Sequence, residues 1–282
     1  MLELIAEDEE HLLGHPSRLA LGDLREWLSR VELGEDTWLY ESDGELCALG
    51  WCDLAPGSDA AFAAGIVRPR FKAHGIGASL LERSESRAAA RGAKRMHQFA
   101  LGKDAAAASL MAAHGYSEVR RFYEMAIELS ERPQVPDIRI ETLNEAEARE
   151  FHAALDEAFQ DHWEHHSLSF EEWWSRHSSS QGFDLSLYFL VRDGGEIAAA
   201  SRNEANRNGG GYVAAIGVRR PWRGKGYAKA LLLHTFRELY DRGITRVTLG
   251  VDAQNPTGAT HLYERVGMHV EQENVVFEKA LP

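Results

Sequence analysis

The chain contains little cysteine: only Cys47 and Cys52 occur among 282 residues. Five positions apart on one predicted strand, the two thiols point to opposite faces of a sheet, so no disulfide between them is expected. Basic residues are also scarce relative to acidic ones, and the net charge is −13. A nucleic-acid partner requires a basic face on the protein, so nucleic acid is not an expected partner.

Long apolar runs are absent too. No run approaches the ~20 residues that a membrane-spanning helix needs, and the N-terminus lacks the basic region and apolar core of a signal peptide. We therefore expect a cytoplasmic protein that does not bind a membrane. The hydrophobic content of 44% and the charged content of 27% are typical of globular proteins. The length suits two domains, and the sequence does not predict the oligomeric state.

The most informative segment is residues 216–232, IGVRRPWRGKGYAKALL, where an apolar strand enters a glycine-bearing turn that opens a helix. Gly224 and Gly226 let the backbone turn sharply and approach a ligand closely. The first N–H groups of the following helix lack partners within the helix and lie at the positive end of its dipole. Arg223 and Lys225 add positive charge. This junction is therefore a predicted phosphate-binding site.

Two other glycine-rich phosphate motifs are excluded. Gly224 and Gly226 lack the full G-x-G-x-x-G of the dinucleotide fingerprint, and the turn lies late in its strand series. No G-x-x-x-x-G-K-[ST] occurs, so the turn is not a P-loop.

Both halves of the chain carry this motif. A second copy of the strand and turn stands at residues 65–81, GIVRPRFKAHGIGASLL. A further segment at 255–268, NPTGATHLYERVGM, has a weaker counterpart at 103–116, KDAAAASLMAAHGY. The order and the approximate spacing are the same in both halves, which predicts two similar domains.

The clearest linker is residues 130–137, SERPQVPD, a polar stretch with two prolines. The predicted domains are 1–132 and 137–282. In the second domain, hydrophobic spacing predicts these elements in order: a strand at 138–142, a helix at 145–161, a short helix with Trp173 and Trp174, strands at 185–192, 196–203 and 212–218, the helix after the turn to about 242, a strand at 245–252, a helix at 257–266 and a final hairpin.

The first domain repeats this pattern from strands at 37–40 and 45–54 onward. Residues 1–16 contain no convincing equivalent of the strand and long helix that open the second domain. Either the first domain is truncated at its start, or the true start of the chain lies upstream of Met1, and the sequence does not decide between the two.

With both motif pairs in place, the chain resembles the GNAT superfamily of acyl-CoA-dependent N-acetyltransferases, in the tandem two-domain layout of mycothiol synthase. The resemblance covers nearly the whole chain. It implies an α/β (α+β) fold of two tandem domains, each a mixed, mostly antiparallel sheet flanked by helices. It also implies acetyl-CoA as co-substrate and a small-molecule amine as acceptor, with direct attack in the C-terminal domain.

In that superfamily the signature Q/R-x-x-G-x-G/A wraps the pyrophosphate of CoA, and Arg223, Gly226 and Ala228 occupy it in the second domain. The resemblance further implies that the pantetheine arm lies along the strand before the turn and that the Val218 amide faces the acetyl carbonyl. Asn255 is expected to contact the arm. The predicted cofactor residues of this domain are Ile216, Gly217, Val218, Arg223, Gly224, Lys225, Gly226, Tyr227, Ala228 and Asn255.

The first domain matches the signature more loosely. Lysine replaces arginine or glutamine at the opening position, and Ala73 stands where the second copy has Gly224. Either this domain binds CoA or it serves only as a packing partner, and the sequence does not decide between the two. Its candidate cofactor residues are Val67, Lys72, His74, Gly75, Ile76, Gly77 and Ala78.

Acetyl transfer needs an acid for the leaving thiolate and a base for the amine. The resemblance implies that Tyr263 is the acid, although it could also simply pack against the sheet. Met111 holds the corresponding place in the first domain and has no proton to give, so that domain is not expected to transfer acetyl. Many family members carry a basic carboxylate on the strand before the turn, which here has none. Glu204 is the nearest acidic candidate, acting through a water, and its competing interpretation is a solvated turn residue.

Two alternatives remain at this point. His162 and His166 share a helical face, but the H-E-x-x-H order is absent, so a surface or substrate-recognition role is favoured and no metal is predicted. The second alternative is a non-catalytic CoA-binding or scaffold protein, which the missing strand carboxylate favours and which Tyr263 and Asn255 oppose.

Overall fold

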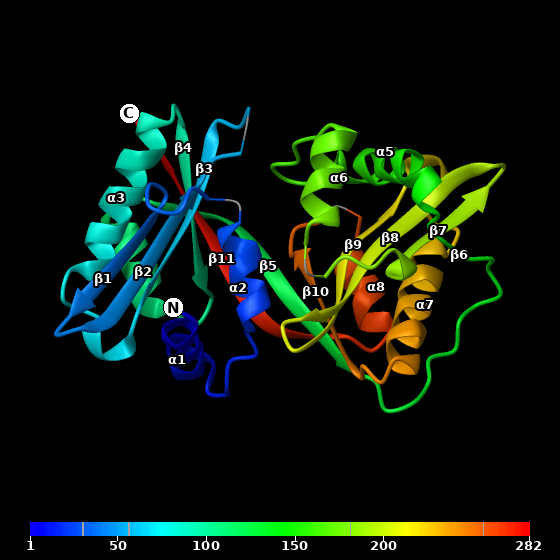
Figure 1. Cartoon of the computed structure of the whole chain (residues 1–282), viewed down its shortest axis with the longest axis horizontal. Helices are drawn as coiled ribbons and strands as arrows, with labels where there is room; N and C mark the ends of the chain where they lie inside the picture. The colour runs from blue at the N-terminus through cyan, green and yellow to red at the C-terminus, as the bar shows by residue number, and fades with distance from the viewer. Residues whose placement is uncertain (30, 56, 181, 256) are drawn as a thin grey trace. The chain divides into compact units, whose positions relative to one another are not determined.

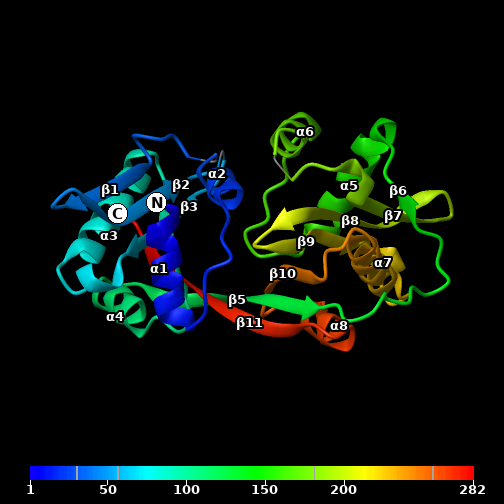
Figure 2. The ribbon, with the colours of Figure 1, turned by 60° about the horizontal axis from the view of Figure 1, so that its bottom comes forward.

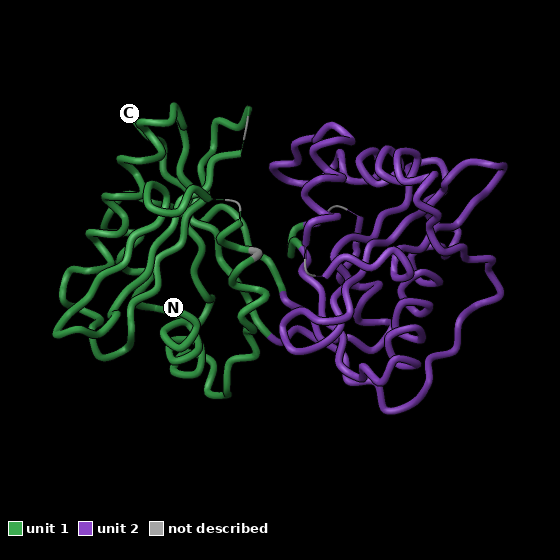
Figure 3. Tube along the Cα trace, in the orientation of Figure 1, with its two compact units in different colours: residues 1–123, 252–254, 272–282 green, residues 124–251, 255–271 purple. Residues whose placement is uncertain are grey.

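The structure is a computed structural model that describes residues 1–29, 31–55, 57–180, 182–255 and 257–282. Two compact units divide the chain (Figure 3). Unit 1 comprises residues 1–123, 252–254 and 272–282, and unit 2 comprises residues 124–251 and 255–271. The predicted domain boundary at 132–137 stays a prediction. What the structure adds is that the end of the chain contributes residues to unit 1.

Unit 1 is a sheet between helices (Figure 1). Its elements are α1 (Leu2–Leu13), α2 (Leu21–Leu28), β1 (Thr37–Ser42), β2 (Glu45–Asp53), β3 (Ala60–Val67), the 3-10 turn η1 (Pro69–Phe71), α3 (Ile76–Ala90), β4 (Arg95–Leu101), α4 (Ala105–Ala113), and parts of β5 (Ser117–Glu128) and β11 (His269–Ala280). The strand order is β1-β2-β3-β4-β11. Only the β3–β4 pair is parallel among the pairs β1–β2, β2–β3, β3–β4 and β4–β11.

Helices cover both faces of this sheet. Leu49 of β2 packs with Leu4 and Ile5 of α1 on one face. The neighbouring Gly50 faces the other side, where a Cβ would lie 2.7 Å from Leu80 of α3. Because successive strand residues alternate between faces, α1 and α3 lie on opposite sides.

Helix α1 corrects the expectation that residues 1–16 contain no long helix. Leu4 and Ile5 are almost fully buried, and Gly14 ends the helix in the left-handed conformation with φ 79°. The helix was missed because its acidic run leaves few apolar positions with helical spacing. It is held by tertiary packing on β2 and β3.

Unit 2 repeats this arrangement (Figure 2). Its own elements are β6 (Glu141–Thr142), η2 (Glu145–Glu147), α5 (Ala148–Phe159), α6 (Phe170–Ser178), η3 (Leu185–Leu187), β7 (Tyr188–Asp193), β8 (Glu196–Arg207), β9 (Gly210–Val218), η4 (Arg220–Trp222), α7 (Tyr227–Asp241), β10 (Arg246–Asp252) and α8 (Ala259–Arg265). The strand order is β10-β9-β8-β7-β6, with β9–β10 parallel and the other pairs antiparallel. The predicted mixed, mostly antiparallel sheets flanked by helices are confirmed.

Two glycines of β9 show how closely helices approach this sheet. A Cβ on Gly217 would lie 2.7 Å from Ala158 of α5. A Cβ on Gly211 would lie 2.5 Å from Leu239 of α7. Both glycines therefore serve packing between strand and helix.

The chain ends in one strand, so the predicted final hairpin is wrong. Residues 274–280 of β11 pair antiparallel with β4, from Asn274 opposite Leu101 to Ala280 opposite Arg95. The segment contains no glycine or proline to turn the chain back. The first predicted strand of the second domain is also shorter than expected, since only Glu141 and Thr142 are paired. Cys47 and Cys52 both lie in β2 as buried free thiols, which confirms the absence of a disulfide between them.

The pairing of β11 with β4 generates a prediction for unit 1. Val276 is fully buried opposite Phe99 of β4. Val276→Asp buries an unpaired carboxylate and should destabilise unit 1 by roughly 3–5 kcal/mol. Hydrogen exchange followed by mass spectrometry should show faster exchange in β3 and β4 with α7 still protected. Val270→Asp, on the same strand at a position 43% exposed, is the matched control and should change neither. Equal effects of the two substitutions would contradict this role of β11.

Candidate active site

The glycine-bearing turn of unit 2 has the conformation that the sequence predicts. Gly224 (φ 82°) and Gly226 (φ 83°) both adopt the left-handed conformation, and α7 begins directly afterwards at Tyr227. A Cβ built on either glycine would meet no described atom within 4 Å. The turn is therefore open, and the first amides of α7 lie at its surface without acceptors inside the helix.

Charged side chains surround this turn. Lys225 Nζ lies 2.7 Å from Asp193, which also accepts a hydrogen bond from the Tyr227 hydroxyl at 2.8 Å. These two contacts, that of Lys225 first, lower the pKa of Asp193. Arg223 donates from Nε to the Val218 carbonyl at 3.2 Å and pairs with Asp161 at 3.2 Å. The cations are thus anchored at the turn while remaining 33% and 48% exposed.

Strand β9 presents backbone amides beside the turn. Its parallel pairing with β10 comprises Gly211 opposite Val247 and Tyr212 opposite Thr248. The Arg219 amide donates to Ala198 of β8 at 3.0 Å. Because successive amides point to opposite edges of a strand, the amide of Val218 points away from β8, toward the β10 side. The same alternation directs the Ile216 amide to that side.

Gly217 lies between the amides of Ile216 and Val218, and its lack of a side chain allows α5 to pack closely on the strand. From the sequence, Gly217 is expected to contact the cofactor. The structure places Ala158 and Phe159 of α5 against it. The irregularities in the β8–β9 register lie further along, at Arg202/Asn203 and Glu204/Arg207.

Tyr263 lies in α8 and is 7% exposed. Burial, and next the nearby Tyr212, raise its pKa to about 12. The phenol therefore keeps its proton at neutral pH, as a proton donor must. Asn255 lies just before α8, where its Oδ1 accepts hydrogen bonds from the Thr257 amide (2.8 Å) and hydroxyl (2.5 Å).

Glu204 is not a solvated turn residue. It lies within β8 and is 3% exposed. Its Oε1 accepts a hydrogen bond from Arg202 at 2.9 Å, and its Oε2 lies 3.5 Å from Arg207. Gly182 covers the carboxylate so closely that a Cβ there would lie 3.1 Å from Oε2. Glu204 is thus a buried carboxylate held between two guanidinium groups.

Sequence reasoning missed Tyr212, which connects the two catalytic candidates. It is the cross-strand partner of Glu204, and its burial raises its own pKa. Its ring lies under the Arg207 guanidinium at 4.3 Å, and its hydroxyl lies 3.4 Å from where a Cβ of Gly250 would be. Tyr212 is also the neighbour that acts on the pKa of Tyr263. Its position as the last β9 residue paired with β10 is visible only in the fold.

The histidine-rich segment after α5 lies beside aromatic side chains. The His162 ring stacks on Phe159 with ring centres 4.3 Å apart, and His165 pairs with Asp156 at 3.1 Å. In the described ranges, no three His, Cys, Asp or Glu side chains form a group that could hold a metal ion. Trp173 is buried and Trp174 is partly buried in one cluster of hydrophobic side chains.

In unit 1 the corresponding residues are placed differently. Lys72 forms ion pairs with Asp8 (2.8 Å) and Asp104 (3.3 Å), and His74 Nδ1 lies 2.8 Å from the Lys72 carbonyl. Met111 is buried in the core of the unit. Val67 ends β3, and Gly75 precedes the first turn of α3, which contains Ile76, Gly77 and Ala78.

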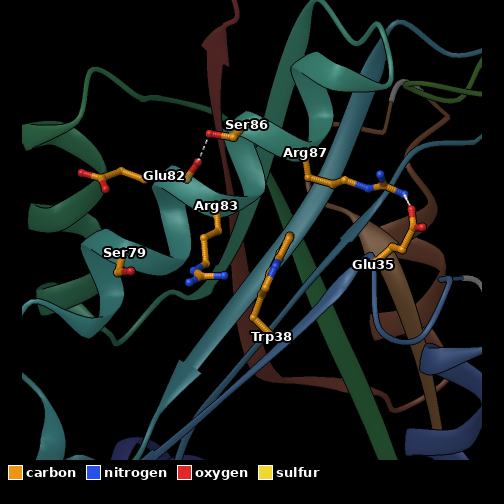
Figure 4. A pocket seen from close by; sticks show the side chains of 7 residues that line it. All are labelled: Glu35, Trp38, Ser79, Glu82, Arg83, Ser86 and Arg87. Atoms are coloured by element: carbon orange, nitrogen blue, oxygen red, sulfur yellow. Dashed lines mark hydrogen bonds and ion pairs between the residues drawn. The ribbon is translucent and has the colours of Figure 1, made fainter.

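A shallow pocket of about 470 Å³ also lies on unit 1, between α3 and the segment that contains β1 (Figure 4). Its lining residues are Glu35, Trp38, Ser79, Glu82, Arg83, Ser86 and Arg87. Both arginines have partners nearby, since Arg83 lies over the Tyr40 ring and Arg87 pairs with Glu35. None of the predicted site residues lines this pocket.

Comparison with known proteins decides the family. The sequence profile of the Acetyltransferase (GNAT) family matches residues 1–116 and 144–268, one match in each half. The chain belongs to this family. It is therefore an acetyltransferase, an enzyme of the acyltransferase class, and the predicted tandem GNAT layout is confirmed.

Individual relatives agree with this assignment. The chain is 29% identical to a mycothiol acetyltransferase from Thermobifida fusca over 82% of this chain and 78% of the relative. It is 30% identical to a mycothiol acetyltransferase from Thermomonospora curvata over 83% and 79%. A GCN5-related N-acetyltransferase from Sphaerobacter thermophilus has a similar structure, with a TM-score of 0.86 and 31% identity over 99% of this chain and 91% of that one.

A tandem GNAT protein from the clavulanic acid biosynthesis pathway shares the fold, with a TM-score of 0.76 at 14% identity and coverage of 100% and 94%. Among the described residues, no helix is long and apolar enough to cross a membrane. The cytoplasmic location stays a prediction.

Proposed function

We propose that this acetyltransferase moves acetyl from acetyl-CoA to an amine of a small molecule, by direct attack, within unit 2. The observation that supports this proposal is that three features come together in unit 2. An open turn lies at the start of α7, two amides of β9 point toward the β10 side, and Tyr263 is kept protonated by burial. CoA brings the thioester whose carbonyl carbon the amine attacks.

The turn fits a pyrophosphate. The amides from Gly224 to Ala228 point out of a turn that no described side chain fills, and Arg223 and Lys225 flank it. The amides of Ile216 and Val218 would align the pantetheine arm and hold the acetyl oxygen, while Asn255 contacts the arm from the start of α8. Negative charge that develops on the acetyl oxygen would then be stabilised by the Val218 N–H.

The remaining two residues, Glu204 and Tyr263, would act in proton transfer. The amine nitrogen loses a proton as it forms the bond to carbon, and Glu204 would accept that proton through a water. The thiolate leaves as its bond to carbon breaks, and Tyr263 would give it a proton. A non-catalytic CoA-binding protein, the second reading of the sequence, needs neither group.

The proposal does not specify which amine accepts the acetyl group. The curated relatives are named mycothiol acetyltransferases. The amine substrate of mycothiol acetylation is therefore the first compound to test. Aminoglycosides, polyamines and peptide N-termini complete the panel, with thiol release as the readout.

Gly226→Val should abolish CoA binding, because a β-branched residue at φ 83° distorts the turn that presents the amides. Calorimetric titration with CoA measures this directly. Gly243→Val is the matched control: Gly243 also has a positive φ (79°) with no described atom near its Cβ position, but it follows α7. Unchanged affinity in the Gly226 variant would remove the assignment of the turn.

Tyr263→Phe should lower turnover by roughly ten- to a thousandfold and leave CoA affinity unchanged. Since the pKa of Tyr263 is about 12, the phenol donates a proton at all lower pH values. The wild-type rate should therefore show no decline from this group below about pH 11. Tyr240→Phe, a change on α7, is the control. Wild-type turnover by the Tyr263 variant would mean that the thiolate takes its proton from elsewhere.

Glu204→Gln should lower kcat/KM by about a hundredfold or more, because it removes the proposed proton acceptor. Glutamine keeps the shape of the side chain between the two arginines, so thermal unfolding must first establish that the variant is folded. Glu196→Gln, an exposed change on the same strand, serves as control. An unchanged kcat/KM would move the base to a water chain or to His165 or His166.

A further inference from the structure

The two glycine-bearing turns have the same backbone, although their sequences differ. In unit 1, Ala73 (φ 64°) and Gly75 (φ 81°) take the left-handed conformations that Gly224 and Gly226 take in unit 2. An alanine in this conformation costs about 1 kcal/mol. The turn of unit 1 therefore keeps its shape, and any difference in ligand binding between the units must come from the side chains and strands around it.

The first difference is the charge at the turn. Lys72 lies between Asp8 of α1 and Asp104, the residue before α4, and the three side chains are only 24%, 12% and 13% exposed. One cation facing two carboxylates gives a net negative cluster. In unit 2 the residue before the corresponding helix α8 is Gly258, which carries no charged side chain. A pyrophosphate approaching Lys72 would displace buried carboxylates of its own sign.

Helix α1 is fixed in the position that brings Asp8 to the turn. Glu7, the preceding residue, pairs with Arg68 at the end of β3, and Arg68 also bonds the Leu46 carbonyl at 2.8 Å. Unit 2 has the same tie, since Arg219 pairs with Glu157 of α5. Next to that tie, α5 presents Ala158 and Phe159 where α1 presents a carboxylate. Helices α1 and α5 therefore hold equivalent positions in their units, and Asp8 is the residue that differs between them.

The second difference is in the apolar packing between α3 and α4. Gly77 lies in the first turn of α3, and a Cβ there would lie 2.9 Å from Leu110 of α4. The corresponding position in unit 2 is Ala228, which carries a Cβ. Leu110 therefore packs closely on the first turn of α3, and the difference between the units at this place is Gly77 against Ala228.

The third difference lies in the strands. The parallel pairing of β3 with β4 extends over four residue pairs, from Ala60–Arg95 to Ala63–Gln98, where β9 and β10 have two. Phe62, which lies within this pairing opposite His97, stacks on Phe99 with ring centres 5.6 Å apart. The residue of β10 that corresponds to Phe99 is Gly250. In unit 1 the two strands therefore stay paired for two residues more than in unit 2, and two rings stack at that end of the pairing.

From the paired lysine above all we propose that unit 1 holds no CoA, so that each chain binds a single CoA in unit 2. Asp8 and Asp104 occupy the cation that would take the pyrophosphate, and displacing them from sites that are 12% and 13% exposed opposes binding. The tight packing of Leu110 on α3 and the longer β3–β4 pairing accompany this difference.

The test is the stoichiometry of CoA binding to the full chain, by calorimetry and by native mass spectrometry. One CoA per wild-type chain and none in the Gly226→Val chain are expected. Two CoA per chain, or one retained by the Gly226→Val chain, would overturn the closure of unit 1. A wild-type chain that binds none would contradict the proposed function of unit 2 while agreeing with a closed unit 1.

A matched pair of substitutions tests the same point in a folded chain that keeps both turns. Lys72→Met and Arg223→Met each remove one cation at the start of the signature and keep an apolar stem. Arg223→Met should weaken CoA binding about tenfold or more, while Lys72→Met should leave stoichiometry and affinity unchanged. Loss of a CoA site in the Lys72 variant, with its fold intact by circular dichroism, would overturn the proposal.

Discussion

The chemistry available to unit 2 depends on where the parallel pairing of β9 with β10 stops. The pairing includes Tyr212 and Thr248, and the β9 amides beyond it point to a side where pairing has ended. A strand edge inside a domain is normally satisfied by a neighbouring strand. Leaving it unpaired next to a helix N-terminus creates a row of donors that continues from strand to turn. Tyr212, at the end of the pairing, is also the residue that lies near both Glu204 and Tyr263.

Comparison of the two units distinguishes the features of the turn that the backbone forms from those that the side chains form. Both turns hold two left-handed residues, and both helices before the sheet are tied by an arginine at the end of the central strand. The units then diverge in a few side chains: Asp8, Asp104 and Phe99 in unit 1 stand against Ala158, Gly258 and Gly250 in unit 2. A carboxylate or a ring thus replaces a small residue at these positions, while the backbone of the turn stays the same.

The last strand explains why the two units occur in one chain. Residues 274–280 of β11 complete the unit 1 sheet beside β4, although they follow all of unit 2 in sequence. Unit 1 therefore cannot complete its sheet until the whole chain is present. Val276 and Phe277 are buried there, so the packing of unit 1 depends on the last residues of the chain.

The sequence by itself determined the features that a short segment controls. Positive-φ glycines followed by a helix start are local, so the turn at 224–226, the repeat at 73–75 and the contrast of Tyr263 with Met111 could all be predicted. The fold class followed from the paired motifs. Only the tertiary structure decided the rest: the helix at residues 2–13, the pairing of β11 with β4, the burial of Glu204 between Arg202 and Arg207, and the contacts of Lys72 with Asp8 and Asp104. Each of these depends on contacts between segments far apart in the chain, whose energies no local pattern of residues contains.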